Sequence, residues 1–72
     1  MNVIDFILER RKWSLYRLHQ ELENLGVEVG YNTLKYYRRA RAIRLDVLLA
    51  LKVLARVSAP KFLKVIEQYL KE

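Results

Sequence analysis

A Gly-containing turn divides residues 14–37 into two short segments, and each segment has the periodicity of an amphipathic helix. In the first segment Ser14 is a favoured N-cap residue, and Gly26 is expected to end the helix. Between them, leucines recur at helical spacing: Leu15, Leu18, Leu22 and Leu25. The stretch therefore predicts two helices joined by a turn within an all-α domain.

The second segment is expected to be helical from about Gly30 to Arg39. Leu34 and Tyr37 are three residues apart and point to one side, which predicts that they are buried. The other side of this helix is formed by polar and aromatic residues: Tyr31, Asn32, Lys35, Tyr36 and Arg38. A helix with such a face can contact DNA, so this segment is the candidate working part of the chain.

Three motifs in a fixed order carry a resemblance to a known family. They are SLYRLHQEL at residues 14–22, VGYNTLKYY at residues 29–37 and IRLDVLLAL at residues 43–51. Together they resemble the Cro/repressor-type helix-turn-helix proteins, also called the xenobiotic-response-element-like family, over about residues 3–58. The resemblance implies a single lambda-repressor-like domain, residues 1–72, built as a compact bundle of about five short helices. It places the helix-turn-helix at about residues 14–39 and implies a small Cro-type repressor that binds double-stranded DNA.

The chain departs from the family pattern in three places. His19 stands where the family usually has a small residue, the turn between the two helices is longer, and the basic loop at residues 38–42 lacks the usual glycine. These departures leave open a second function. In that reading the fold is a protein-interaction module that binds RNA polymerase or a toxin without reading a DNA sequence.

Charge favours a polyanionic partner. The 72 residues include 14 Lys and Arg against 8 Asp and Glu, for a formal net charge of +6. Cysteine is absent, which excludes disulfides, thiolate metal sites and cysteine nucleophiles. The chain has no apolar run long enough to span a membrane and no recognisable signal peptide, so we expect no membrane partner and a cytoplasmic location.

The resemblance implies that the helix at about residues 30–39 enters the major groove with its N-terminal part. Asn32 is the candidate for direct base reading, because an Asn amide can form two hydrogen bonds with adenine. The other predicted base contacts on this helix are Tyr31, Thr33, Lys35 and Tyr36. Asn is also favoured at helix N-termini, so a role for Asn32 as a cap or turn residue stays open.

Basic residues next to this helix predict phosphate contacts. The block from Lys35 to Arg44 contains five cations and no acid, and Arg17 is expected to hold a phosphate from the preceding helix. The predicted phosphate-binding residues are Arg17, Arg38, Arg39, Arg41 and Arg44. Ile43 and Leu45 are expected to anchor the end of this basic loop to the core.

The first helix is expected from about Asn2 to Lys12, with Asn2 as its cap. The cations at residues 10–12 suit its C-terminus, and the alternative is that one of them holds a phosphate. Trp13 is predicted to pack in the core. Acids at Glu21, Glu23 and Glu28 are expected to face away from DNA.

A fourth helix with Asp46 in its first turn is predicted to be largely buried, and a fifth is predicted at about residues 59–71, with Ser58 as its cap and Pro60 in its first turn. The apolar stripe of the fifth helix is either part of the monomer core or a contact in a homodimer. The residues of the predicted dimer contact are Phe62, Ile66, Tyr69 and Leu70.

No catalytic or metal-binding constellation is recognisable. His19 is the single histidine, so it lacks a partner for ligation or acid–base work and is predicted to be a wedge between helices. The carboxylates are scattered, and two glycines are too few for a phosphate-cradling loop. We therefore expect neither an enzyme nor a cofactor.

Overall fold

The computed structural model describes residues 2–39 and 42–71, with side chains through residue 68. Five α-helices follow one another in this part of the chain, which contains no strand. Their bounds are α1 Val3–Arg11, α2 Leu15–Asn24, α3 Tyr31–Tyr37, α4 Leu45–Ala55 and α5 Ala59–Lys71. The predicted all-α class and the predicted number of helices are confirmed.

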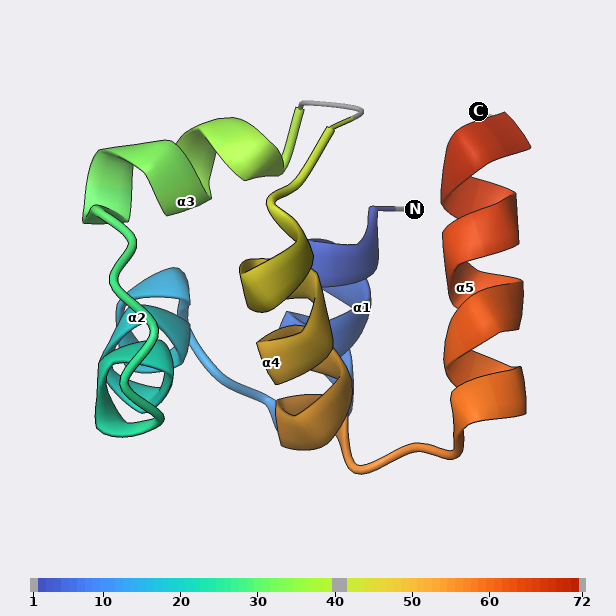
Figure 1. The fold of residues 1–72 in the computed structure, drawn as a ribbon, viewed down its shortest axis with the longest axis horizontal. Helices are drawn as coiled ribbons and strands as arrows, with labels where there is room; N and C mark the ends of the chain where they lie inside the picture. Colours follow the sequence, from blue (N-terminus) through green and yellow to red (C-terminus); the bar gives the residue numbers. More distant parts are fainter. Residues whose placement is uncertain (1, 40–41, 72) are drawn as a thin grey trace.

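The helices are arranged around a central pair. α1 and α4 lie in the middle, with α2 and α3 on one side and α5 on the other (Figure 1). α1 packs against α4 and α5, whereas α2 packs against α3 and α4. α3 crosses one end of the molecule, near the start of α4, and no other helix lies beyond it in this view. The helix that carries the predicted base contacts thus lies at the periphery of the molecule (Figure 1).

The helix ends follow from local capping residues. Asn2 and Ser14 are the N-caps of α1 and α2, and the Ser14 Oγ accepts a hydrogen bond from the Arg17 N–H at 3.1 Å. Gly26, just after α2, has a φ of 82°, a left-handed conformation that glycine adopts without steric cost. At the start of α5 the Ser58 Oγ lies 3.4 Å from the Lys61 N–H. These predicted starts and stops are confirmed.

The core is aliphatic and draws on all five helices. The largest fully buried side chains are Val3, Ile4, Ile7, Leu18, Leu22, Leu34, Val47 and Leu51. Leu34 and Tyr37 are both buried, as the spacing in the sequence predicts, whereas Tyr36 is exposed. Trp13 is partly buried against the core, in agreement with its predicted packing role, and the guanidinium groups of Arg11 and Arg17 lie over its ring.

Two predictions about apolar residues are wrong. Leu45 does not anchor the basic loop, because its side chain is 70% exposed; Ile43 alone packs against the core there. Phe62, a predicted dimer contact, is only 4% exposed and belongs to the core, so it offers no surface to a second copy. Ile66 also packs against the core as a partly buried residue. The side chains of Tyr69 and Leu70, predicted in the same contact, lie outside the described part of the chain.

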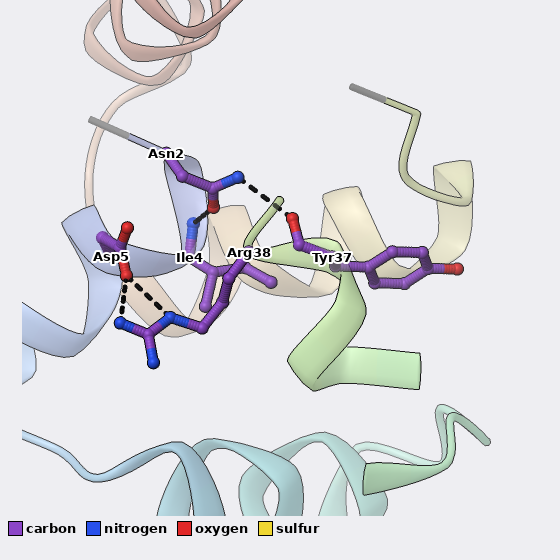
Figure 2. A network of polar contacts seen from close by, with 5 residues as sticks. All are labelled: Asn2, Ile4, Asp5, Tyr37 and Arg38. Carbon is purple, nitrogen blue, oxygen red and sulfur yellow. Dashed lines mark hydrogen bonds and ion pairs between the residues drawn. The ribbon is translucent and has the colours of Figure 1, made fainter. Parts of the chain in front are cut away.

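The N-terminus of α1 is fastened to the C-terminus of α3 (Figure 2). Asn2 is buried, its Oδ1 accepts a hydrogen bond from the Ile4 N–H at 2.7 Å, and its Nδ2 donates to the Tyr37 carbonyl at 3.0 Å. Beside it, the Arg38 guanidinium bonds the Asp5 carboxylate at 2.8 and 2.9 Å. One end of α3 is therefore held by side chains more than thirty residues away in the sequence.

Arg10 has a structural role in addition to the predicted one. Its Nε donates a 2.7 Å hydrogen bond to the carbonyl of Ala55, the last residue of α4, and its Nη2 donates to the Arg56 carbonyl at 3.3 Å. Carbonyls at the end of a helix lack partners within that helix, so a cation there satisfies them. Arg10 thus lies in the last turn of its own helix, as predicted, and its side chain also caps α4.

Candidate nucleic-acid interface

The outward face of α3 carries the exposed side chains of Asn32, Lys35 and Tyr36, and the exposed Arg39 follows two residues after the helix ends at Tyr37. The opposite face holds Leu34 and Tyr37, which are buried and fix the rotation of the helix about its axis. An amide, two cations and a phenol thus point to solvent together. We call these four residues the α3 face.

The position of Asn32 excludes one of its two interpretations. The N-cap of α3 is Gly30, and no side chain caps this helix end. Asn32 lies two residues further on, inside the helix, with its side chain exposed. The interpretation of Asn32 as the cap is therefore wrong, and its amide is free to meet a ligand. Base reading by Asn32 stays a prediction.

The two remaining predicted base contacts lie at the edge of this face. The Tyr31 ring has its centroid 5.9 Å from that of His19 and 6.4 Å from that of Tyr16, so residues of α2 orient it. Tyr31 and Thr33 also line a cavity of about 690 Å³, whose charged residues are Glu23, Glu28 and a single cation, Arg44. Carboxylates repel phosphates, so this edge is less suited to DNA than the α3 face.

His19 holds the connection between α2 and α3. This connection covers residues 25–30, which agrees with the predicted long turn. The His19 ring is partly buried, and its Nε2 lies 2.9 Å from the Val29 carbonyl and 3.3 Å from the Glu23 carboxylate. The histidine therefore ties the end of the connection back to α2, which is consistent with its predicted role between helices.

Three of the predicted phosphate-binding arginines are in ion pairs within the chain. Arg17 pairs with Glu21 at 3.0 Å, Arg38 with Asp5 at 2.8 Å and Arg44 with Asp46 at 2.6 Å. Each arginine remains about half exposed, so its guanidinium can still meet a phosphate by sharing or exchanging its carboxylate. Arg41 lies outside the described residues.

Arg39 and Lys35 differ from these three arginines, since neither pairs with a carboxylate of the described residues. They line a shallow hollow of about 280 Å³ at the C-terminal end of α3, together with Arg38 and Asp5. Three cations surround this hollow against one acid, and that acid is already bonded to Arg38. The hollow therefore has an excess of positive charge and the chemistry of a phosphate site.

The local ion pairs shift the pKa values of their members. The hydrogen bond from Arg17 holds the pKa of Glu21 below its usual value. The hydrogen bond from Arg44 likewise lowers the pKa of Asp46, and the same contact raises the pKa of Arg44. Both acids are thus charged at neutral pH, and Arg17 and Arg44 are partly neutralised.

Replacing Arg17 with Ala is expected to raise the pKa of Glu21 toward that of an ordinary glutamate, because the main donor to its carboxylate is lost. The side-chain carboxyl resonance of Glu21, followed by NMR as a function of pH, measures the shift. Arg38→Ala is the matched control and is expected to leave this titration unchanged. An unchanged Glu21 titration in Arg17→Ala would show that the ion pair is not populated in solution.

Metal ligands, membrane-spanning helices and similarity to known proteins give no further indication of function for the described residues. The described residues contain no group of His, Asp and Glu side chains placed to hold a metal ion, and no described helix is long and apolar enough to cross a membrane. Comparison with family models, curated proteins and solved structures finds no match. The resemblance to the Cro/repressor-type family therefore stays a prediction, and the function has to be inferred from the surface of this chain.

Proposed function

We propose that this chain binds duplex DNA through α3 and acts as a small transcriptional regulator, with repression by occupancy of its site. The observation that carries the proposal is the α3 face. Asn32, Lys35 and Tyr36 are exposed together on a helix at the periphery of the molecule, and the exposed Arg39 follows just after its end. Asn can read adenine, Lys and Arg can bind guanine or phosphate, and Tyr can donate to a phosphate oxygen.

The shape of the molecule supports this use of α3. An α-helix with its side chains is about 10–12 Å across, and the major groove of B-DNA is about 12 Å wide. α3 crosses one end of the domain without another helix beyond it (Figure 1), so it can enter a groove with the other helices outside. The basic hollow of Lys35, Arg38 and Arg39 at the end of α3 then meets the backbone at the edge of the groove.

Base reading by Asn32 and phosphate binding by Arg39 predict two different mutant phenotypes. Asn32→Ala is expected to weaken binding to the preferred sequence by about 1–3 kcal/mol and to relax the preference at one base pair. Arg39→Ala is expected to weaken binding to all sequences alike and to reduce the salt dependence by about one counterion. Selection from a randomised duplex pool gives the preferred site, and fluorescence anisotropy over a range of salt concentrations measures both effects.

The matched controls lie on α5, where Gln68→Ala removes an exposed amide and Lys64→Ala an exposed cation. Neither is expected to change DNA affinity beyond the small effect of net charge. If the wild-type protein retains no duplex, or if both α3 variants bind as the wild type does, the proposal is wrong.

A protein-interaction module is the second candidate, and the exposed aromatic rings favour it. Tyr16 and Tyr36 both have highly exposed rings, and Tyr is enriched in protein–protein hot spots. A protein partner such as RNA polymerase or a toxin would bind there without a DNA sequence preference. The salt response separates the two functions, because DNA binding falls steeply with added salt and an apolar protein interface does not.

A further inference from the structure

α4 has an apolar stripe that no part of the described chain covers. Leu45, Leu49 and Val53 follow at intervals of four residues, which places them on one side of the helix. Their side chains are 70%, 56% and 60% exposed. The opposite side of α4 is buried in the core through Val47, Ala50, Leu51 and Ala55. An exposed aliphatic stripe along a whole helix is typical of an interaction surface.

We propose that the α4 stripe packs against the same stripe of a second copy, in parallel and around a two-fold axis that runs along the helices. In such an isologous contact Leu45, Leu49 and Val53 each meet their own counterpart. The stripe is uniformly aliphatic, so it is complementary to itself. A continuous contact of this kind can exclude water without leaving a buried polar group unpaired.

Charge at the edges of the stripe selects the parallel arrangement. In an ideal helix Asp46, which also pairs with the exposed Arg44, lies on one flank of the stripe and Lys52 on the other. Parallel packing brings Asp46 of one copy to the same flank as Lys52 of the other copy. Antiparallel packing would place the two aspartates together on one flank and the two lysines together on the other. Flanking charges choose orientation in this way in paired helices generally.

The parallel arrangement also suits the proposed function, on which this one step rests. α3 lies at the end of the molecule where α4 begins (Figure 1). A two-fold axis along α4 therefore brings both α3 helices to the same end of the dimer, where one duplex can reach them. An antiparallel pair would carry them to opposite ends.

The interface is small. Stable protein–protein interfaces bury about 800 Å² on each partner, and three aliphatic side chains supply only part of that area. We therefore expect a weak dimer, with a dissociation constant on the order of 10 µM or above, that a duplex with two half-sites stabilises.

Sedimentation equilibrium of the full chain, over a concentration range that spans the expected dissociation constant, tests the contact. Leu49→Lys in the centre of the stripe is expected to keep the protein monomeric throughout, with an unchanged helical CD spectrum. Leu63→Lys is the matched control, because Leu63 on α5 is 57% exposed, almost the same as Leu49. It is expected to dimerise like the wild type. A wild-type protein that stays monomeric, or equal dimerisation of all three proteins, overturns the proposal.

Single cysteines test the orientation, since the natural chain has none. Leu45→Cys alone and Val53→Cys alone are each expected to form a disulfide-linked dimer under mild oxidation. An antiparallel pair would link only when the two variants are mixed, because Leu45 of one copy would then face Val53 of the other. Linkage in the mixture alone overturns the parallel arrangement, and linkage in none of the three samples overturns the contact.

DNA binding gives an independent readout. Leu49→Lys is expected to bind a duplex with two half-sites at least tenfold more weakly than Leu63→Lys, while both bind a single half-site equally. A dimer that binds no DNA would overturn the proposed function and leave the α4 contact intact. A monomer that binds DNA would overturn the contact alone.

Discussion

Replacing Asn2 with Ala is expected to lower the free energy of unfolding by about 2–4 kcal/mol, although the residue is second in the chain. The substitution removes the side-chain cap of α1, which costs about 1 kcal/mol. It also leaves the Tyr37 carbonyl without the donor that Asn2 supplies in a buried setting, which costs a further 1–3 kcal/mol or so. A domain of this size has a total stability on the order of 5 kcal/mol, so the loss is severe.

A second variant separates the two contributions. Asn2→Ser keeps an oxygen that can cap α1 but cannot reach the Tyr37 carbonyl as the longer amide does, so it is expected to recover only the capping part of the loss. Urea unfolding followed by CD gives both values. If Asn2→Ala unfolds at the same urea concentration as the wild type, the two hydrogen bonds of the Asn2 side chain (Figure 2) contribute nothing to stability in solution.

Replacing Leu34 with Ala is expected to lower the free energy of unfolding by about 2–5 kcal/mol and to abolish sequence-specific DNA binding. Leu34 is fully buried, so its truncation leaves a cavity in the core. α3 has only 7 residues, and a helix this short is not stable without packing. Since Leu34 and Tyr37 fix the rotation of α3, the loss of one anchor also disturbs the orientation of the α3 face.

Leu49→Ala is the matched control, because it removes the same atoms from an exposed site on α4. At protein concentrations that keep the chain monomeric it is expected to change the free energy of unfolding by less than about 0.5 kcal/mol. Thermal or urea unfolding measures both variants, and anisotropy with a single half-site, whose binding does not depend on the α4 contact, measures their DNA affinity. Equal losses of unfolding free energy in Leu34→Ala and Leu49→Ala would show that Leu34 is not a core residue.

The parts of the fold that local signals determine could be predicted from the sequence. Ser14 and Ser58 cap their helices, Gly26 takes a left-handed conformation, and Leu34 and Tyr37 are buried at the expected spacing. Each depends on residues within one or two turns, so propensity and periodicity are enough to find it. The division of the chain into five helices follows from the same signals.

The errors have an identifiable physical origin. α4 has the sequence LDVLLALKVLA, which is apolar on almost every side, so periodicity cannot tell which leucines face the core. The sequence therefore predicts Leu45 to be inside, whereas it is exposed. Phe62 lies on a strongly amphipathic helix, and only the packing of α5 on α1 shows that its ring is buried and not offered to a second copy.

The candidate site is less predictable than the fold, because its charges depend on tertiary contacts. The Arg17–Glu21 pair has the i,i+4 spacing of helical ion pairs, so the sequence contained a signal for it. Arg38 and Asp5 are 33 residues apart, and nothing in their local sequences indicates that they meet. Only the structure shows that Lys35 and Arg39 lack such acid partners among the described residues and share a hollow.

The central place of α1 has a consequence for the order in which the molecule can form. α1 is synthesised before the residues that its side chains contact. The Asn2 amide cannot donate to the Tyr37 carbonyl, and Arg10 cannot donate to the Ala55 carbonyl at the end of α4, until those residues have left the ribosome. Until α4 emerges, Val3, Ile4 and Ile7 have no helix to cover them on that side. We therefore expect nascent chains that end before residue 45 to be open and sensitive to protease, and protection to be acquired in a single late step once α4 is complete.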